Sequence, residues 1–303
     1  NGTDYYDKPL ASTGYSEIDL SGATLPLTTT GNITITDTQG TSGLWSVRVD
    51  GKRLVDSNAT PPNFPAISAT GCSIGTKQGF SIVKYTGSGN DGDGVPHGLS
   101  QKPDLVIVKN IDRSSTEWRV WHSGFGDNRN LKLGSDGAQD KNYWGDGNVY
   151  GYTSSDTSII LSGPPSTTTA EDVNLSGDNY IMYSWHDVPG LQKFGTFVGV
   201  NDPDGPFIEL GFRPAIIWVK RISGSGNNWV VQDSERQKYN PVSDYLLLNS
   251  SGNTASGLDT DFLSNGFKIR NTNGNMNASS TYIYCAWAES PAVNLYGGTS
   301  NAR

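Results

Sequence analysis

The chain has few charged residues and no long apolar run. Charged side chains make up 17% of its 303 residues, against roughly 25% in an average globular chain. Acidic residues outnumber basic ones by 30 to 22, which gives a formal net charge of -8. Because phosphate binding needs a surface rich in Lys and Arg, this balance argues against nucleic acid as a partner. No apolar run approaches the roughly 20 residues that span a bilayer, so membrane insertion is not expected either.

Cysteine and histidine are scarce as well. Cys72 and Cys285 lie far apart and lack the spacing of a metal site, so they allow one disulfide at most. The histidines belong to no hydrolase or metalloprotease motif, and there are only three of them: His97, His122 and His186. The sequence therefore predicts neither a metal site nor a catalytic histidine.

No catalytic centre and no cofactor are predicted. A pair of carboxylates for glycoside hydrolysis must lie about 5–10 Å apart, which is a property of the fold and not of the sequence. Four acidic residues are available for such a pair: Glu117, Asp233, Glu235 and Glu289. Nothing in their spacing marks two of them as partners, so hydrolysis stays an alternative interpretation.

Glycine and large aromatic residues are abundant instead. The chain holds 37 Gly, 8 Trp, 14 Tyr and 9 Phe, whereas disordered chains lack large rings. Apolar and polar residues alternate over 80–85 and 180–185, the pattern of half-buried strands, and no segment shows a helical stripe. An Asp50-Gly51 turn between two apolar segments predicts a β-hairpin. The fold class expected is all-β.

The sequence repeats itself. Residues 90–122 align with 201–233 without a gap, and 12 of the 33 positions are identical. Further identities follow at an offset of 102 residues, as in Trp185 and Trp287. This pattern predicts a tandem duplication of an antiparallel β-sandwich, lectin-like or jelly-roll-like, over residues 77–190 and 191–293. A small N-terminal β region (1–76) precedes the two sandwiches, and a short tail (294–303) follows them.

Two pairs of tryptophans stand at matching positions of the two copies. Trp118 corresponds to Trp229, and Trp185 corresponds to Trp287. Burying such a ring brings the large apolar area that a glycine-rich sandwich otherwise lacks. All four tryptophans are therefore expected in the core.

An acidic loop recurs with the repeat: NDGDG at 90–94 and NDPDG at 201–205. An EF-hand calcium loop would need a Glu at its twelfth position, where Lys102 and Arg213 stand. Asp and Asn beside Gly or Pro also form tight turns by bonding their own backbone. The loops are interpreted as turns without metal; a weak calcium site completed by other loops is the alternative.

One aromatic stretch belongs to the first copy alone. Residues 142–152 hold Tyr143, Trp144, Tyr150 and Tyr152 among Gly, Asn and Asp, while 250–261 in the second copy has no aromatic residue. Rigid rings beside small polar groups are typical of binding loops. The four aromatic residues are therefore the predicted receptor-contact site. The alternative is that they pack on the edge of their own sandwich or on a neighbouring subunit.

Seven segments carry a resemblance to a known family: VRVDGKRLVDS, GFSIVKYTGSG, HGLSQKPDLVIVKN, WHDVPGLQKFGTF, DGPFIELGFRP, DFLSNGFKIRN and YIYCAWAESP. They resemble the C-terminal region of tail-fibre proteins of tailed bacteriophages, marine ones in particular, from about residue 17 to the final Asn-Ala-Arg. The resemblance implies a virion component, usually trimeric, whose lectin-like sandwiches present loops to the host surface. It brings no catalytic motif, and the aromatic loop lies in its most variable part.

One functional hypothesis and two alternatives follow. The first is a fibre tip or adhesin on the virion that recognises a bacterial surface glycan or protein without catalysis, as a homotrimer in contact with other virion proteins. The second is a purely structural decoration protein of the virion. The third is a polysaccharide depolymerase. A glycan array separates the first from the second, and release of reducing sugar separates the first from the third.

Overall fold

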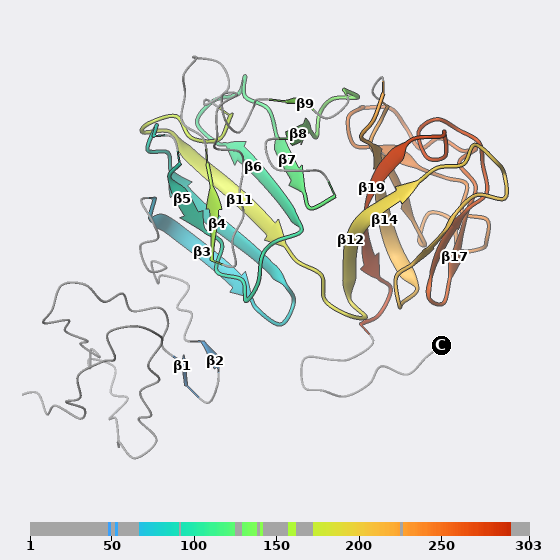
Figure 1. The fold of residues 1–303 in the computed structure, drawn as a ribbon, viewed down its shortest axis with the longest axis horizontal. Helices are drawn as coiled ribbons and strands as arrows, with labels where there is room; N and C mark the ends of the chain where they lie inside the picture. Colours follow the sequence, from blue (N-terminus) through green and yellow to red (C-terminus); the bar gives the residue numbers. More distant parts are fainter. Residues whose placement is uncertain are drawn as a thin grey trace, which may run out of the picture. The chain divides into compact units, whose positions relative to one another are not determined.

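Antiparallel β-sheets make up the described part of the chain (Figure 1). The computed structural model describes residues 48–49, 52–53, 67–90, 92–124, 129–137, 140–141, 157–161, 172–224 and 227–291. The chain divides into two units, Asn1–Leu44 and Trp45–Arg303, and all described residues belong to the second. The all-β prediction is confirmed.

The first large sheet, called sheet 1, has seven strands. In spatial order they are β3 (Ala69–Gly75), β4 (Phe80–Thr86), β11 (Asn179–Trp185), β6 (Leu105–Asn110), β7 (Arg119–His122), β8 (Arg129–Lys132) and β9 (Asp140–Lys141). A small sheet of β10 (Ser158–Ile160) and β5 (Gly94–Pro96) accompanies it. These two sheets are called repeat 1 below.

The second large sheet, called sheet 2, has five strands. In spatial order they are β12 (Gln192–Val198), β19 (Thr281–Ala288), β14 (Pro214–Arg221), β15 (Val230–Asp233) and β16 (Leu246–Leu247). Its companion sheet holds β13 (Phe207–Glu209), β18 (Gly266–Ile269) and β17 (Thr260–Leu263). These two sheets are called repeat 2. A separate short hairpin pairs β1 (Arg48–Val49) with β2 (Lys52–Arg53).

Five strands of each large sheet follow the same order, which shows the duplication in the topology. The series β4-β11-β6-β7-β8 in sheet 1 corresponds to β12-β19-β14-β15-β16 in sheet 2. The registers agree as well, since Tyr85 pairs with Tyr180 and Phe197 pairs with Tyr282. Sheet 1 has two further strands, β3 and β9, at its two edges. Strand β3 pairs with β4, although the sequence placed it in the N-terminal region. The domain boundaries themselves stay predictions.

Each large sheet has an inner face toward its companion sheet and an outer face on the opposite side. In β19, Tyr282, Tyr284 and Ala286 belong to the core of repeat 2, whereas Ile283 and Cys285 belong to a cluster shared with repeat 1. Both faces of β19 are therefore buried. This double burial explains why the segment is apolar almost without interruption, as is typical of strands covered on both faces. Cys285 and Cys72 do not form a disulfide.

Candidate functional site

A buried asparagine holds the acidic loop in each repeat. Asn174 Oδ1 accepts a hydrogen bond from Ser88 N at 2.9 Å, and its Nδ2 donates to Asn90 O at 2.9 Å. In repeat 2, Asn277 Oδ1 accepts from Val200 N at 2.9 Å, and its Nδ2 donates to Asp202 O at 2.7 Å, one position further along the loop than Asn90. Both asparagines are fully buried. The loop recurs because its backbone is part of the framework.

Close backbone contact and a tyrosine complete this arrangement. A Cβ on Gly87 would lie 2.2 Å from Leu175 O, and one on Gly199 would lie 2.1 Å from Ala278 O, so both positions require glycine. Tyr180 OH accepts from Leu175 N at 2.8 Å, and Tyr282 OH accepts from Ala278 N at 2.9 Å. This pair of loop-binding residues is visible in the sequence of both repeats, because an Asn precedes each of these tyrosines by five or six residues.

The carboxylates of the second acidic loop have protein partners. Asp202 Oδ1 accepts from Asp204 N at 2.8 Å, which is the turn that the sequence predicted. Asp204 pairs with Lys268 and Arg270, each at 3.1 Å, and these cations lower the pKa of its carboxyl group. Among the described residues, no group of three or more His, Cys, Asp or Glu is placed to hold a metal ion. Asp91, in the first loop, lies outside them.

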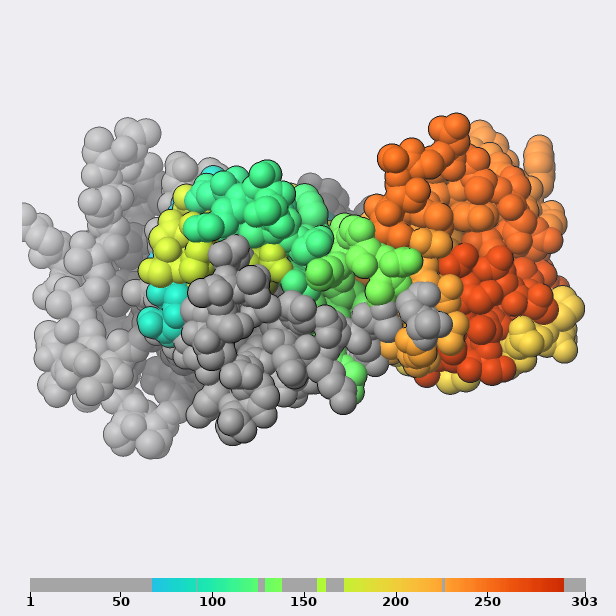
Figure 2. Space-filling model, turned by 90° about the horizontal axis from the view of Figure 1, so that it is seen from above, coloured from blue at the N-terminus to red at the C-terminus, as the bar shows by residue number. Residues whose placement is uncertain are grey.

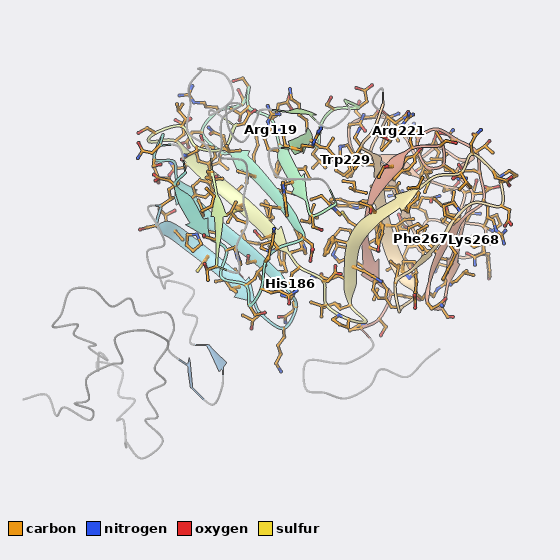
Figure 3. The ribbon with its side chains drawn as sticks, in the orientation of Figure 1. Arg119, His186, Arg221, Trp229, Phe267 and Lys268 are labelled. Carbon is orange, nitrogen blue, oxygen red and sulfur yellow. The ribbon has the colours of Figure 1, made fainter. Side chains whose placement is uncertain are left out.

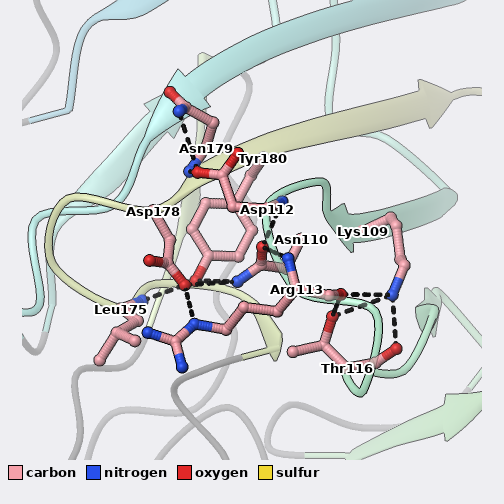
Figure 4. A network of polar contacts seen from close by, with 9 residues as sticks. All are labelled: Lys109, Asn110, Asp112, Arg113, Thr116, Leu175, Asp178, Asn179 and Tyr180. Carbon is pink, nitrogen blue, oxygen red and sulfur yellow. Dashed lines mark hydrogen bonds and ion pairs between the residues drawn. The ribbon is translucent and has the colours of Figure 1, made fainter.

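A lysine holds the hairpin loop after β6 in repeat 1 (Figure 4), and another holds the loop after β14 in repeat 2. Lys109 Nζ donates to the hydroxyl of Thr116 at 2.9 Å and to its carbonyl. Lys220 Nζ donates to the carbonyl of Asn227, the residue that corresponds to Thr116. Burial lowers the pKa of Lys220 to about 8. In repeat 1 the same loop is also tied to β11, because Asn110 Nδ2 donates to Asp178 Oδ2 at 2.8 Å.

The predicted receptor-contact residues, Tyr143, Trp144, Tyr150 and Tyr152, lie outside the described part of the chain. The described strands on either side show where the segment is attached. It leaves β9 at the edge of sheet 1 and returns at β10 in the small sheet. Sheet 2 ends at β16 and has no described counterpart of β9.

The tryptophan prediction is correct for one ring of four. Trp229 is 1% exposed, but the corresponding Trp118 is 39% exposed and is not a core residue. Trp185 and Trp287 are partly buried and contact each other, with ring centroids 6.5 Å apart. The repeat shows on which face of the sheet each ring lies, but burial depends on what covers that face.

Aromatic rings form a continuous row along the outer faces. Trp118 lies 6.3 Å from Tyr183, and Tyr183 lies 6.2 Å from Trp185, with angles of 27° and 19° between the ring planes. Trp185 contacts Trp287, which in turn contacts Trp218 at 5.1 Å. The row thus runs from the interface between the repeats out to the exposed ring of Trp118.

Repeat 1 contacts the outer face of sheet 2 through the end of β7 and the segment after β8. His122 Nε2 lies 3.1 Å from Tyr284 O, and Trp229 Nε1 donates to Lys132 O at 3.0 Å. Lys220 Nζ donates to Asp136 O at 2.9 Å. Trp229 lies on the side of repeat 2 that faces repeat 1 (Figure 3). The surfaces of the two repeats meet there, with a notch between green and orange atoms along one side (Figure 2).

His122 links the repeats as a neutral ring. Gly124 N donates to its Nδ1 at 2.8 Å, so Nδ1 is an acceptor and the proton sits on Nε2, which donates to Tyr284 O. Burial lowers the pKa of His122 to about 4. This contact could not be predicted from the repeat, because the corresponding residue of repeat 2 is Asp233.

Two aspartates lie at the connection between the repeats. Asp104 Oδ2 accepts from Asp187 N at 2.9 Å, and Asp187 Oδ1 accepts from Phe194 N at 2.7 Å. Burial raises the pKa of Asp187 to about 6, and the nearby charge of Asp104 adds to the shift. The two carboxylates thus hold backbone N–H groups where β11 leads into β12.

The other candidate catalytic groups have structural partners. His97 Nδ1 accepts from Leu99 N at 3.1 Å, and His186 Nδ1 lies 2.7 Å from Asp187 O; both histidines are buried. Each of the four candidate carboxylates forms an ion pair: Glu117 with Lys132, Asp233 with Arg236, Glu235 with Lys238 and Glu289 with Arg213.

A family model described as a domain of unknown function (DUF7483) matches residues 53–291. The chain belongs to this family. Since the match spans both repeats, the family domain is the duplicated pair of sandwiches and not one sandwich. No curated protein and no solved structure matches the chain. No helix among the described residues is long and apolar enough to cross a membrane.

Proposed function

We propose that this member of the DUF7483 family is a non-catalytic recognition module of a phage virion. It works as a fibre tip or adhesin, assembled as a homotrimer, and it binds a bacterial surface glycan or protein. The resemblance of its sequence segments to tail-fibre proteins supports the virion setting. The contrast between shared framework and unshared loop supports the recognition role.

The observation that carries the proposal is the separation of framework from insert. The asparagine, glycine, tyrosine and lysine contacts described above occur in both repeats, so they serve the fold. The segment 142–157 leaves from β9, a strand that repeat 2 lacks among its described residues. Chain that the framework does not need is free to serve recognition, and loops on a rigid scaffold are where binding residues concentrate.

The side-chain chemistry of this segment suits recognition of a glycan or a protein. Tyr143, Trp144, Tyr150 and Tyr152 supply large rings that lose little conformational entropy on binding. Ring faces suit the C–H surfaces of sugars, and neighbouring Asn and Asp side chains suit hydroxyl groups. A few aromatic anchors commonly dominate binding energy, at about 2 kcal/mol or more each.

The test combines Trp144→Ala with a matched control, Phe207→Ala, which removes a ring that is 43% exposed on the companion sheet of repeat 2. Losing an anchor of about 2 kcal/mol lowers affinity roughly thirtyfold. Trp144→Ala should therefore lose adsorption to host cells and keep its melting temperature, while the control keeps both. Normal adsorption with a melting temperature several degrees lower would show that the loop packs and does not bind. Release of reducing sugar from host polysaccharide would show a depolymerase instead.

A further inference from the structure

Strand β12 stands at an edge of sheet 2, whereas the corresponding strand of sheet 1, β4, has a neighbour on both sides. In sheet 1, β3 pairs with β4 in antiparallel fashion from Phe80 to Tyr85. In sheet 2, β12 has β19 on one side and, among the described residues, no strand on the other. The duplicated sheet therefore has a place for one more strand, and repeat 1 shows what fills that place.

The first half of the β12 edge is closed by the connection between the repeats. Val188 N donates to Gln192 O at 3.0 Å, and Gln192 N donates to Val188 O at the same distance. Asp187 Oδ1 accepts from Phe194 N at 2.7 Å. These bonds also show that Gln192 and Phe194 direct their backbone groups away from β19, because the residues of an antiparallel strand alternate between its two sides.

The second half of the β12 edge is open. By the same alternation, Thr196 and Val198 direct their N–H and C=O groups away from β19. None of these four groups has a hydrogen-bond partner in the part of the chain that the structure describes. Val200 N, the next donor on this side, is held by Asn277 Oδ1 at 2.9 Å. Such a row of unpaired backbone groups is a template for pairing with another extended chain.

The exposed side chains of the open half are apolar. Val198 is 61% exposed, and Val200 is 52% exposed. The corresponding residues of repeat 1 are polar, Thr86 and Ser88. Native sheets commonly protect an exposed edge with charged residues or proline, and residues 196–200 contain neither. The copy with the open edge is thus the one with β-branched apolar residues, which favour strand pairing.

We propose that the open half of the β12 edge, residues 196–200, binds an extended strand of another protein by antiparallel pairing. The strand takes the place that β3 takes on sheet 1, and small or β-branched side chains like those of β3 suit it. Its backbone satisfies the outward groups of Thr196 and Val198. The inference deepens the proposed function and rests on it only for the partner being a virion protein.

The surroundings of the edge favour a single strand over a second whole sandwich. Repeat 1 lies beside Thr196, since a Cβ added to Gly124 would stand 2.3 Å from Thr196 Cγ2. A neighbouring strand needs only about 5 Å in the plane of the sheet. A second copy of the chain would have to bring a complete sheet to the same place.

The test measures how a fluorescent peptide with the sequence of residues 67–76, carrying Cys72→Ser, binds to the whole chain. Val198→Pro removes one outward N–H and leaves the bonds to β19 in place, a position where an edge strand tolerates proline. Thr196→Pro removes the other outward N–H and replaces this variant if its fold fails. Val198→Thr keeps the N–H and the branched side chain, so it is the matched control. Thermal unfolding and light scattering verify the fold and the oligomeric state of each variant.

The expected result is saturable binding to the wild type and to Val198→Thr, with binding to the proline variant weaker by about tenfold or more, as for a lost hydrogen bond at a pairing edge. In the free chain, the amide hydrogens of Thr196 and Val198 should exchange with solvent faster than that of Phe197, which is bonded to β19. Both should become protected when the peptide binds.

Three results would overturn the proposal: no binding up to about 1 mM peptide, equal binding to the proline variant, or slow exchange of both amides in the free chain. A wild-type oligomer that Val198→Pro dissociates would assign the edge to a second copy, and it would overturn the proposal as well. Adsorption to cells does not enter this test, so the receptor function and the pairing edge can fail separately.

Discussion

Trp118 and Trp229 are the same residue at the same position of two copies of one sandwich, and only one of them is buried. Each lies directly before the corresponding strand of its sheet, β7 or β15. Trp229 is covered by Lys132 and its neighbours from repeat 1, whereas Trp118 is 39% exposed. The same position of a duplicated fold can thus be core in one copy and surface in the other, and what covers that position decides which.

The largest expected effect on stability comes from replacing the buried tryptophan, and replacing the exposed one should have a much smaller effect. Trp229→Ala should lower the free energy of unfolding by about 3–5 kcal/mol, because it leaves a cavity and takes the indole donor from Lys132 O. Trp118→Ala should cost about 1 kcal/mol, as expected for a residue near the surface. Urea unfolding of both variants under conditions where the chain is monomeric gives the two values. Equal losses would show that the two faces are covered alike.

The buried asparagines provide the opposite comparison, because substituting either of them should lower the stability by a similar amount. Asn174→Ala and Asn277→Ala each leave buried backbone groups without a partner, at a cost of about 1–3 kcal/mol. The exposed Asn253→Ala is the control and should stay within about 0.5 kcal/mol of the wild type. Thermal unfolding measures all three. A loss at one asparagine only would contradict the shared framework.

The pH dependence of stability separates two groups at the interface between the repeats. The pKa of His122 is lowered to about 4, so its contribution is complete above about pH 6.5 and is lost as the pH falls toward 4. The pKa of Asp187 is raised to about 6, so its contribution is complete below about pH 4 and is lost as the pH rises through 6. The two groups oppose each other in the wild type.

Removing one group should reveal the pH dependence of stability that the other group contributes. Asp187→Asn should become less stable as the pH falls from 6.5 to 4, with a slope of at most about 1.4 kcal/mol per pH unit for the one proton at His122. His122→Gln should become more stable over the same range. Urea midpoints at several pH values between 4 and 7 show the slopes. If the slope of stability against pH is unchanged in both variants, neither residue contributes to the pH dependence as described.

The smallest expected effect concerns the tyrosine hydroxyls. Tyr180→Phe and Tyr282→Phe each remove an acceptor for a backbone N–H that lies shortly before β11 or β19, at about 1 kcal/mol per hydrogen bond. The rings and their stacking on Tyr85 and Phe197 stay in place. Two similar shifts in melting temperature are expected. A shift in one variant alone would mean that the two frameworks differ here.

The sequence predicted the framework well because many identities at a constant offset mark residues that both copies use in the same way. Lys109 and Lys220 are an example, since each holds the carbonyl of the same loop position. Strand β3 was missed because ATGCSIG is rich in small residues and lacks the alternation that marks a half-buried strand.

The contacts between the repeats could not be predicted from the sequence. Repeat 2 has Asp233 at the position of His122, so a comparison of the copies indicates no shared role for this histidine. Trp118 was placed in the core because its partner in the alignment is a tryptophan, although the alignment says nothing about what covers a face. The receptor-contact prediction for Tyr143, Trp144, Tyr150 and Tyr152 stays a prediction.

The central claim is that Trp118 and Trp229 occupy equivalent positions of the two repeats and differ only in what covers them. It is tested most directly by ¹⁹F NMR of fluorotryptophan, with both rings assigned by substitution and their solvent isotope shifts compared. The account predicts that Trp229 is shielded from solvent and that Trp118 is accessible to it. Equal accessibility of the two rings would contradict the account.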